Sequence, residues 1–231
     1  MEEELLSQLN TVQNNIKIAA KKANRPLNEI KLLAVSKKHS MKKITFFKKK
    51  GLDIFAESRV QELLEKNEES SNISWHFIGH LQRNKVKYLM RMDNLKLIHS
   101  LDSWRLALEI NKRSAKNNRI MNLLLQVNVA DEDSKYGIKI NEVYDFLSNA
   151  SILENINIIG LMTMAPYEAS TEELRLVFRR LANLRKEMQE KGFSLKELSM
   201  GMSKDYQIAI EEGATILRLG SALFGKREGS L

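Results

Sequence analysis

The segment INIIGLMT, residues 156–163, is followed by EELRLVFRRLANLRKEMQE at 172–190 and by LKELSM at 195–200. The long middle piece is amphipathic, because apolar side chains recur at helical spacing with charged residues between them; the stripe consists of Leu174, Val177, Phe178, Leu181 and Leu184. The flanking pieces are short and almost continuously apolar, which is typical of strands in a buried parallel sheet. Because parallel strands need a long crossover between them, this stretch predicts a strand–helix–strand unit.

The same alternation of apolar runs and amphipathic stretches extends over the whole chain. The predicted strands are Lys31–Ser36, Leu52–Ala56, Trp75–Gly79, Leu95–Ser100, Met121–Val129, Ile156–Thr163, Leu195–Met200 and Ile216–Gly220. A helix is expected before them, at about Glu3–Ala23, with Leu5, Leu6, Leu9, Val12 and Ile16 on its apolar face. Eight β/α units after one extra helix predict an α/β fold, a single (β/α)8 TIM-type barrel that forms one domain over residues 1–231. A doubly wound open sheet is the alternative.

Composition narrows the class of protein. The chain has 231 residues, of which 43% are hydrophobic and 29% are charged, as in a soluble globular protein. It has no cysteine, which excludes disulfides and thiolate chemistry, and no apolar run near the ~20 residues that cross a bilayer. The acidic, amphipathic start MEEELLSQLN does not resemble a secretory signal, so we expect a cytoplasmic protein without a membrane segment.

The net charge of +8 admits a basic nucleic-acid-binding barrel as an alternative function. However, the sequence contains no zinc finger, no RNA-recognition motif and no basic stripe interleaved with aromatic residues. Solvated helix faces explain the charge better, so no specific nucleic acid is expected. The four histidines lack metal-ligand spacing, and we expect no metal site.

Polar residues follow the apolar runs at the ends where barrels of this class build their sites. Lys37 comes directly after the apolar residues of the first predicted strand. A lysine at such a position can lose part of its hydration, which lowers its pKa and leaves a neutral amine able to form a Schiff base with an aldehyde. The plainer interpretation is that Lys37, like its neighbour Lys38, begins a solvated loop.

The last two predicted strands each lead into a turn of small residues. Ser199-Met-Gly-Met-Ser203 follows one, and Gly220-Ser221 follows the other, where barrels frequently bind phosphate. We therefore expect an amine at one side of the barrel mouth and a phosphate site at the other. Pyridoxal 5′-phosphate (PLP) carries both an aldehyde and a phosphate, and so does the substrate of a sugar-phosphate aldolase.

Four ordered motifs make the pattern specific. The motifs are VSK at 35–37, HFIGHLQRNKVK at 76–87, GLMTMAP at 160–166 and SMGMSKDYQIAIEEGATILRLGSALFG at 199–225, with SKYGI at 134–138 also fitting. Together they resemble the YggS/PROSC family of pyridoxal phosphate homeostasis proteins over nearly the whole chain. The resemblance implies a barrel similar to the N-terminal domain of alanine racemase.

The resemblance also implies roles for individual residues. Lys37 would carry PLP as a Schiff base, and Arg218 would face the pyridine nitrogen. His80 is not assigned by the resemblance; from its position at a strand end we expect it either to line the pocket or to order its loop. The phosphate would be held by Ser199, Met202, Ser203, Gly220 and Ser221. A guanidinium cannot accept the pyridinium proton, so the ring stays neutral and is a poor electron sink; the aldolase interpretation gives such an arginine no role.

The family implied by the motifs is regarded as non-catalytic, holding or passing on the cofactor and balancing amino-acid pools. The second base of related racemases is a tyrosine on a C-terminal domain that is not expected here, since the sequence ends at Leu231. We therefore expect a monomeric PLP carrier, with PLP-dependent apoenzymes as candidate recipients and a racemase-like enzyme of low activity as the alternative. Lys135 is a candidate secondary amine.

Four further residues carry expectations. Ser58 and Arg59 replace an amide and an aromatic residue that the family usually has after its second strand, which puts the contact of Ser58 with the cofactor ring in doubt. His39 is expected at the surface, and His76 is expected to pack inside a strand layer.

Overall fold

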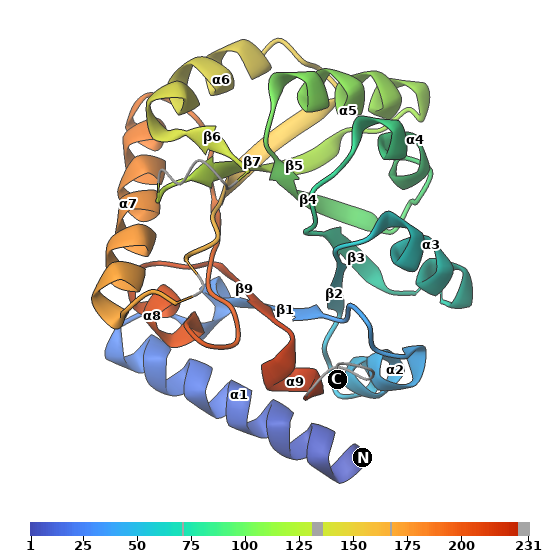
Figure 1. The fold of residues 1–231 in the computed structure, drawn as a ribbon, viewed down its shortest axis with the longest axis vertical. Helices are drawn as coiled ribbons and strands as arrows, with labels where there is room; N and C mark the ends of the chain where they lie inside the picture. The colour runs from blue at the N-terminus through green and yellow to red at the C-terminus, as the bar shows by residue number, and fades with distance from the viewer. Residues whose placement is uncertain (71, 131–135, 167, 226–231) are drawn as a thin grey trace.

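The computed structural model describes residues 1–70, 72–130, 136–166 and 168–225. Eight parallel strands pair in the order β4-β3-β2-β1-β9-β8-β7-β5, and a β4–β5 pairing closes the ring (Figure 1). These strands are β1 Lys31–Val35, β2 Ile54–Glu57, β3 Ser74–Phe77, β4 Leu95–Leu101, β5 Met121–Asn128, β7 Ile156–Met162, β8 Glu197–Ser199 and β9 Ile216–Leu219. The closed ring confirms the predicted TIM-type barrel and excludes the doubly wound open sheet. The prediction of one domain over residues 1–231 stays a prediction.

A short ninth strand, β6 (Ile138–Lys139), was not predicted. It pairs in parallel with the end of β5 at Val127 and Asn128. Gly137 precedes it at φ +134°, and a Cβ atom there would lie 2.8 Å from the backbone nitrogen of Asn128. Only glycine allows the chain to approach the strand so closely. Two residues are too few to show a period in the sequence.

Helices alternate with the strands around the outside of the ring, as Figure 1 shows. The α-helices are α1 Glu2–Lys22, α2 Met41–Lys49, α3 Val60–Glu69, α4 Val86–Leu89, α5 Trp104–Lys116, α6 Val143–Ala150, α7 Thr171–Glu190, α8 Tyr206–Glu211 and α9 Ser221–Phe224, with 3-10 turns η1 Leu27–Glu29, η2 Arg83–Lys85 and η3 Ile140–Glu142. The longest interior helix, α7, starts at a capping box in which Ser170 and Glu173 bind each other's backbone N–H groups. Among the described residues, no helix has both the length and the apolarity to cross a bilayer.

The N-terminal helix α1 forms as predicted and lies beside α8 and α9 (Figure 1). Its buried face consists of Leu5, Leu9, Val12, Ile16, Ala19 and Ala20. Leu6 was expected on that face but is 36% exposed, because it lies one position away from the buried stripe. The amide of Asn15 donates to the phenol oxygen of Tyr206 at 3.1 Å, which fixes α1 on α8.

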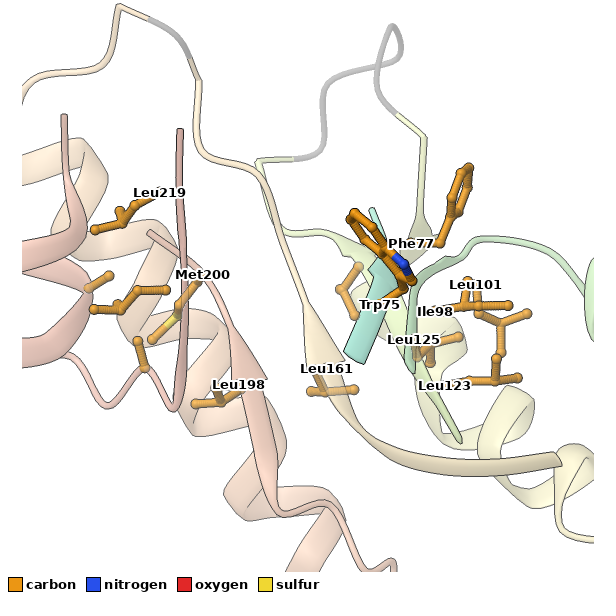
Figure 2. Packing of buried hydrophobic residues seen from close by; sticks show 14 of the residues in the cluster. Trp75, Phe77, Ile98, Leu101, Leu123, Leu125, Leu161, Leu198, Met200 and Leu219 are labelled. Carbon is orange, nitrogen blue, oxygen red and sulfur yellow. The ribbon is translucent and has the colours of Figure 1, made fainter. Parts of the chain in front are cut away.

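The barrel buries two separate apolar layers. A small interior layer fills the ring and consists of Leu33, Val35, Ala56, Leu97, Leu124, Met162 and Ile216. A larger outer layer packs between the strands and the helices and includes Trp75, Phe77, Ile98, Leu125 and Leu161 (Figure 2). Side chains alternate between these layers along each strand. The buried side chains of His99 and Arg218 come two residues after Leu97 and Ile216 of this layer, so they face inward nearer the carboxyl end of the ring.

Candidate functional site at the carboxyl end of the barrel

Lys37 lies in the turn that follows β1. Ser36 before it is buried, Lys37 itself is half-buried, and Lys38 after it is exposed. The backbone of Lys38 has φ +63°, a left-handed conformation that non-glycine residues adopt rarely. The chain thus reverses direction immediately after Lys37, which keeps that residue at the carboxyl end of the ring.

We expected the Gly220-Ser221 turn to face Lys37 from the opposite side of the barrel mouth. That expectation is wrong, because this turn adjoins the Lys37 turn. The first and last strands of a closed barrel are neighbours, and β1 pairs with β9 from Lys31↔Ile216 to Ala34↔Leu219. A Cβ atom added at Gly220 would lie 3.4 Å from the carbonyl oxygen of Val35. The two predicted binding elements therefore meet along one side of the mouth.

The turn after β8 reaches toward the same place. The hydroxyl oxygen of Ser203 accepts hydrogen bonds from the backbone N–H groups of Gly220, at 3.3 Å, and Ala222, at 3.1 Å. The N–H of Met202 donates to the carboxylate of Asp205, which orders this turn. The structure thus brings Met202, Ser203 and Gly220 together, with Ser221 exposed at the start of α9.

Gly201 is required in the β8 turn by its conformation and by its surroundings. Its φ is +88°, and an added Cβ atom would lie 2.5 Å from the Cβ atom of Ala209. The turn therefore packs tightly on α8, which holds the Ser203 hydroxyl in place.

Arg218 extends from β9 into the barrel and is 5% exposed. Its guanidinium donates from Nη1 to the hydroxyl of Ser199 at 2.7 Å and from Nη2 to the carbonyl of Thr163 at 2.8 Å. Burial lowers the pKa of Arg218 to about 10, while the carboxylate of Asp205 acts in the opposite direction. The side chain is therefore cationic at neutral pH and held by two neighbouring strand ends.

Two buried histidines continue this network. His99 Nδ1 lies 2.8 Å from the hydroxyl oxygen of Ser199, and His99 Nε2 lies 3.0 Å from Nδ1 of His76. Burial lowers the pKa of His76 to about 3 and lowers that of His99 well below its ordinary range. Both rings are neutral at pH 7, and each offers one donor and one acceptor nitrogen.

Sequence reasoning gave His99 and Thr163 no role, although it placed both at strand ends. It assigned Ser199 to the phosphate. The structure places the buried Ser199 hydroxyl between Arg218 and His99, so its contact with a phosphate stays a prediction. The sequence did contain a signal for His99. Every second residue of a strand faces the same side, and His99 lies two residues after the inward-facing Leu97.

The remaining predicted residues order the surrounding loops. His80 Nδ1 lies 2.9 Å from Asp102 Oδ2, and the His80 ring stacks on Tyr136 at 4.1 Å between centroids. His39 is only 4% exposed and stacks on Phe224 at 4.8 Å, so the surface position expected for it is wrong. Its position is explained by the apolar underside of α9, which a sequence pattern does not reveal.

The other expectations have simple outcomes. Ser58 is half-buried and Arg59 is exposed. The backbone of Ser58 lies close to Gly79, since a Cβ atom added at Gly79 would be 2.0 Å from the carbonyl oxygen of Ser58. His76 packs inside the barrel, as expected. Lys135 falls outside the described residues. Over the described ranges, no group of three or more metal-ligating side chains gathers.

Fold and site together define a TIM-type barrel that presents a lysine, an arginine and a hydrogen-bonding turn at neighbouring strand ends. The family described as "Alanine racemase, N-terminal domain" matches residues 7–228. A pyridoxal phosphate homeostasis protein of Aquifex aeolicus is 45% identical over 223 residues, covering 95% of this chain and 97% of the relative. The chain therefore belongs to the alanine racemase N-terminal domain family and, within it, to the pyridoxal phosphate homeostasis proteins.

Solved structures agree with this placement. PipY of Synechococcus elongatus PCC7942, determined with PLP bound, has a TM-score of 0.80 and 32% identity, covering 91% of this chain and 99% of PipY. A protein from Bifidobacterium adolescentis described as unknown has a TM-score of 0.92 and 29% identity, covering 96% of this chain and 95% of that one. The resemblance drawn from the four motifs is confirmed.

Proposed function

We propose that this protein holds pyridoxal 5′-phosphate as a Schiff base on Lys37 and acts in cofactor homeostasis, buffering or passing on PLP and balancing amino-acid pools. The observation that carries the proposal is the adjacency of β1, β9 and β8. These three neighbouring strands bring Lys37, Arg218 and the Ser203 turn to one side of the barrel mouth. PipY, a structural relative, was solved with PLP bound.

The phosphate fits the Ser203 turn for a chemical reason. Two backbone N–H groups, from Gly220 and Ala222, already converge on one oxygen atom, the hydroxyl of Ser203. Convergent N–H donors are the arrangement that a phosphate oxygen requires. A bound phosphate would therefore share these donors with Ser203, and Met202 and Ser221 would border it.

The position of Lys37 fits the aldehyde. In PLP the aldehyde and the phosphate arm are attached to neighbouring ring carbons, so their binding groups must lie close together. Strands β1 and β9 are hydrogen-bonded neighbours and meet this requirement. The amine of Lys37, once it has lost its proton, would add to the aldehyde carbon, with a C=N bond replacing C=O and the oxygen leaving as water.

Arg218 supports holding the cofactor over catalysis. Bound PLP supplies an electron sink chiefly when its ring nitrogen is protonated. Arg218 is cationic and carries only donors, so it would leave a facing ring nitrogen unprotonated. The guanidinium is held by the hydroxyl of Ser199, which is itself bound to His99. Because burial lowers the pKa of His99, its ring is neutral at pH 7 and is not an acid that could protonate the cofactor ring.

A racemase-like enzyme of low activity is the second candidate function. The second base of such an enzyme would be a tyrosine. Tyr206 is buried against Asn15, whereas Tyr136 stacks on His80 near the mouth. The position of Tyr136 is the observation that favours this alternative. The relatives' naming as homeostasis proteins favours the carrier.

The setting of the protein is also proposed. The absence of cysteine suits the reducing cytoplasm. We propose a monomer that delivers PLP to PLP-dependent apoenzymes, with nucleic acid and membranes playing no part.

The proposal is tested by spectroscopy of purified protein loaded with PLP. Wild-type protein should absorb in the region typical of a Schiff base, and borohydride should fix one cofactor on Lys37 by mass spectrometry. Lys37→Ala should lose both signals, and Lys42→Ala, which removes an exposed lysine of α2, should keep them. A normal spectrum in Lys37→Ala would remove Lys37 from the site. Turnover of alanine at ~1 per second or faster would favour the racemase.

A further inference from the structure

The peptide unit before Lys37 is held from outside the barrel. The ammonium group of Lys66, on α3, donates to the carbonyl oxygen of Ser36 at 2.8 Å. The hydroxyl of Ser36 donates to the carboxylate of Glu57, at the end of β2, at 2.7 Å. Both polar groups of Ser36 that face outward are thus bound by charged side chains.

The peptide unit after Lys37 is held by the same helix. The carboxylate of Glu62 accepts a hydrogen bond from the backbone N–H of Lys38 at 2.5 Å. This bond acts on the residue with φ +63°, a left-handed conformation that is unfavourable for a non-glycine residue. The turn that exposes Lys37 is therefore stabilised by a side chain that does not enter the site.

These three charged residues form one cluster, here called the Glu57–Lys66–Glu62 cluster. Lys66 Nζ lies 2.7 Å from Glu57 Oε1 and 2.8 Å from Glu62 Oε1. The side chain of Glu57 is fully buried, and that of Lys66 is 9% exposed. Within the described chain, Glu57 Oε2 has no hydrogen-bond partner.

A buried ion cluster of this kind needs an explanation beyond stability. Removing charges from water is costly, and apolar residues of similar volume often stabilise a protein equally well. The hydrogen bonds of this cluster to the backbone end on Ser36 and Lys38, the two residues that flank Lys37. The cluster therefore fixes the one stretch of backbone on which the direction of the Lys37 side chain depends.

We propose that the Glu57–Lys66–Glu62 cluster is a positioning device for Lys37, which holds the peptide units on both of its sides so that its amine is aimed at the cofactor aldehyde. This inference rests on the proposed function, since it assumes that Lys37 reacts with PLP. Glu62 and Lys66 are positioning residues, because they act through the backbone and do not touch the cofactor.

The inference is tested by separating Schiff-base formation from recognition of the ring and phosphate. Pyridoxine 5′-phosphate carries a hydroxymethyl group in place of the aldehyde, so its dissociation constant measures recognition alone. The rate at which PLP forms the Lys37 Schiff base, followed by stopped-flow absorbance, measures positioning of the amine. In Glu62→Gln and Lys66→Met, we expect this rate to fall roughly tenfold or more, with unchanged affinity for pyridoxine 5′-phosphate.

Matched variants complete the test. Glu65→Gln makes the same change at an exposed residue of α3. Glu65, Glu62 and Lys66 all line a surface cavity of about 690 Å3, but the carboxylate of Glu65 accepts a hydrogen bond from the Gln61 side chain. Glu65→Gln should behave as wild type, and Lys66→Arg should restore part of the rate lost in Lys66→Met. Wild-type rates in Glu62→Gln and Lys66→Met would overturn the inference. An equal loss of affinity for both ligands would also overturn it, since the cluster would then support only the fold.

The failure of the proposed function has a different signature. If borohydride fixed no cofactor on Lys37 of the wild-type protein, the proposed function and this inference would both be refuted. That result is obtained before any variant is made.

Discussion

Replacing Glu57 by glutamine is expected to change how the free energy of unfolding depends on pH. Glu57 is fully buried at the end of β2, and burial raises its pKa to about 7 from an ordinary value of 4.5, although Lys66 and Ser36 act in the opposite direction. The carboxyl group of Glu57 therefore binds a proton more tightly in the folded protein than in the unfolded chain. The stabilising contribution of the proton is complete below about pH 4.5 and is lost as the pH rises through about 7.

The magnitude follows from the two pKa values. One pKa unit corresponds to about 1.4 kcal/mol, and a shift from 4.5 to about 7 gives a loss of about 2–3 kcal/mol between pH 5 and pH 8. Glutamine does not titrate, so Glu57→Gln should lack this loss. His76 and His99 titrate in both proteins, and their effect cancels in the difference between variant and wild type.

The assay is equilibrium urea denaturation of both proteins at pH 5 and pH 8. The stability of wild type minus that of Glu57→Gln should fall by about 2–3 kcal/mol from the lower to the higher pH, whatever constant offset the substitution adds. The reasoning is refuted if the Glu57→Gln difference is the same at both pH values.

Three further outcomes are expected. Gly160→Ala would place a Cβ atom 2.1 Å from the carbonyl oxygen of Glu197, so it should cost more than ~2 kcal/mol in thermal unfolding. Gly220→Ala, whose nearest neighbour lies at 3.4 Å, should cost less, and equal costs would contradict the packing argument. Burial lowers the pKa of His76 to about 3, so its neutral form stabilises the fold fully above pH 6.5, and this contribution declines by about 1.4 kcal/mol per pH unit as the pH falls. In His76→Gln the free energy of unfolding should therefore depend less on pH below 6.5. An unchanged slope would count against a buried neutral ring. Arg218→Leu removes the cationic donor from two buried oxygen atoms and should cost about 2–4 kcal/mol in urea denaturation; no loss would show that these bonds are not formed.

The barrel could be predicted because its periodic signals are strong. The stripe of α7 spans enough residues to identify a helix, and the eight apolar runs have the length of strands and alternate regularly with amphipathic stretches. Strand ends shifted by one or two residues, as at β2, which includes Glu57, and β8, which begins only at Glu197. The two-residue strand β6 was missed because its existence depends on pairing with β5 and not on its own residues.

The site was only partly accessible to sequence reasoning. Lys37 and the Ser203 turn could be selected because each directly follows an apolar run. The link from Arg218 through Ser199 to His99 could not, because it joins strands that lie about a hundred residues apart and meet only when the ring closes. The same closure made the expected placement of the amine opposite the phosphate turn wrong.

The pairing of β1 with β9 has a consequence for biogenesis. Lys37 lies near the beginning of the sequence and Gly220 near its end, so Lys37 is synthesised long before the Gly220-Ser221 turn. On the proposed function, cofactor binding at this site requires that β9 has paired with β1, and a chain stalled or truncated before β9 would lack the proposed phosphate site. Bound PLP would then indicate that translation and closure of the barrel are both complete.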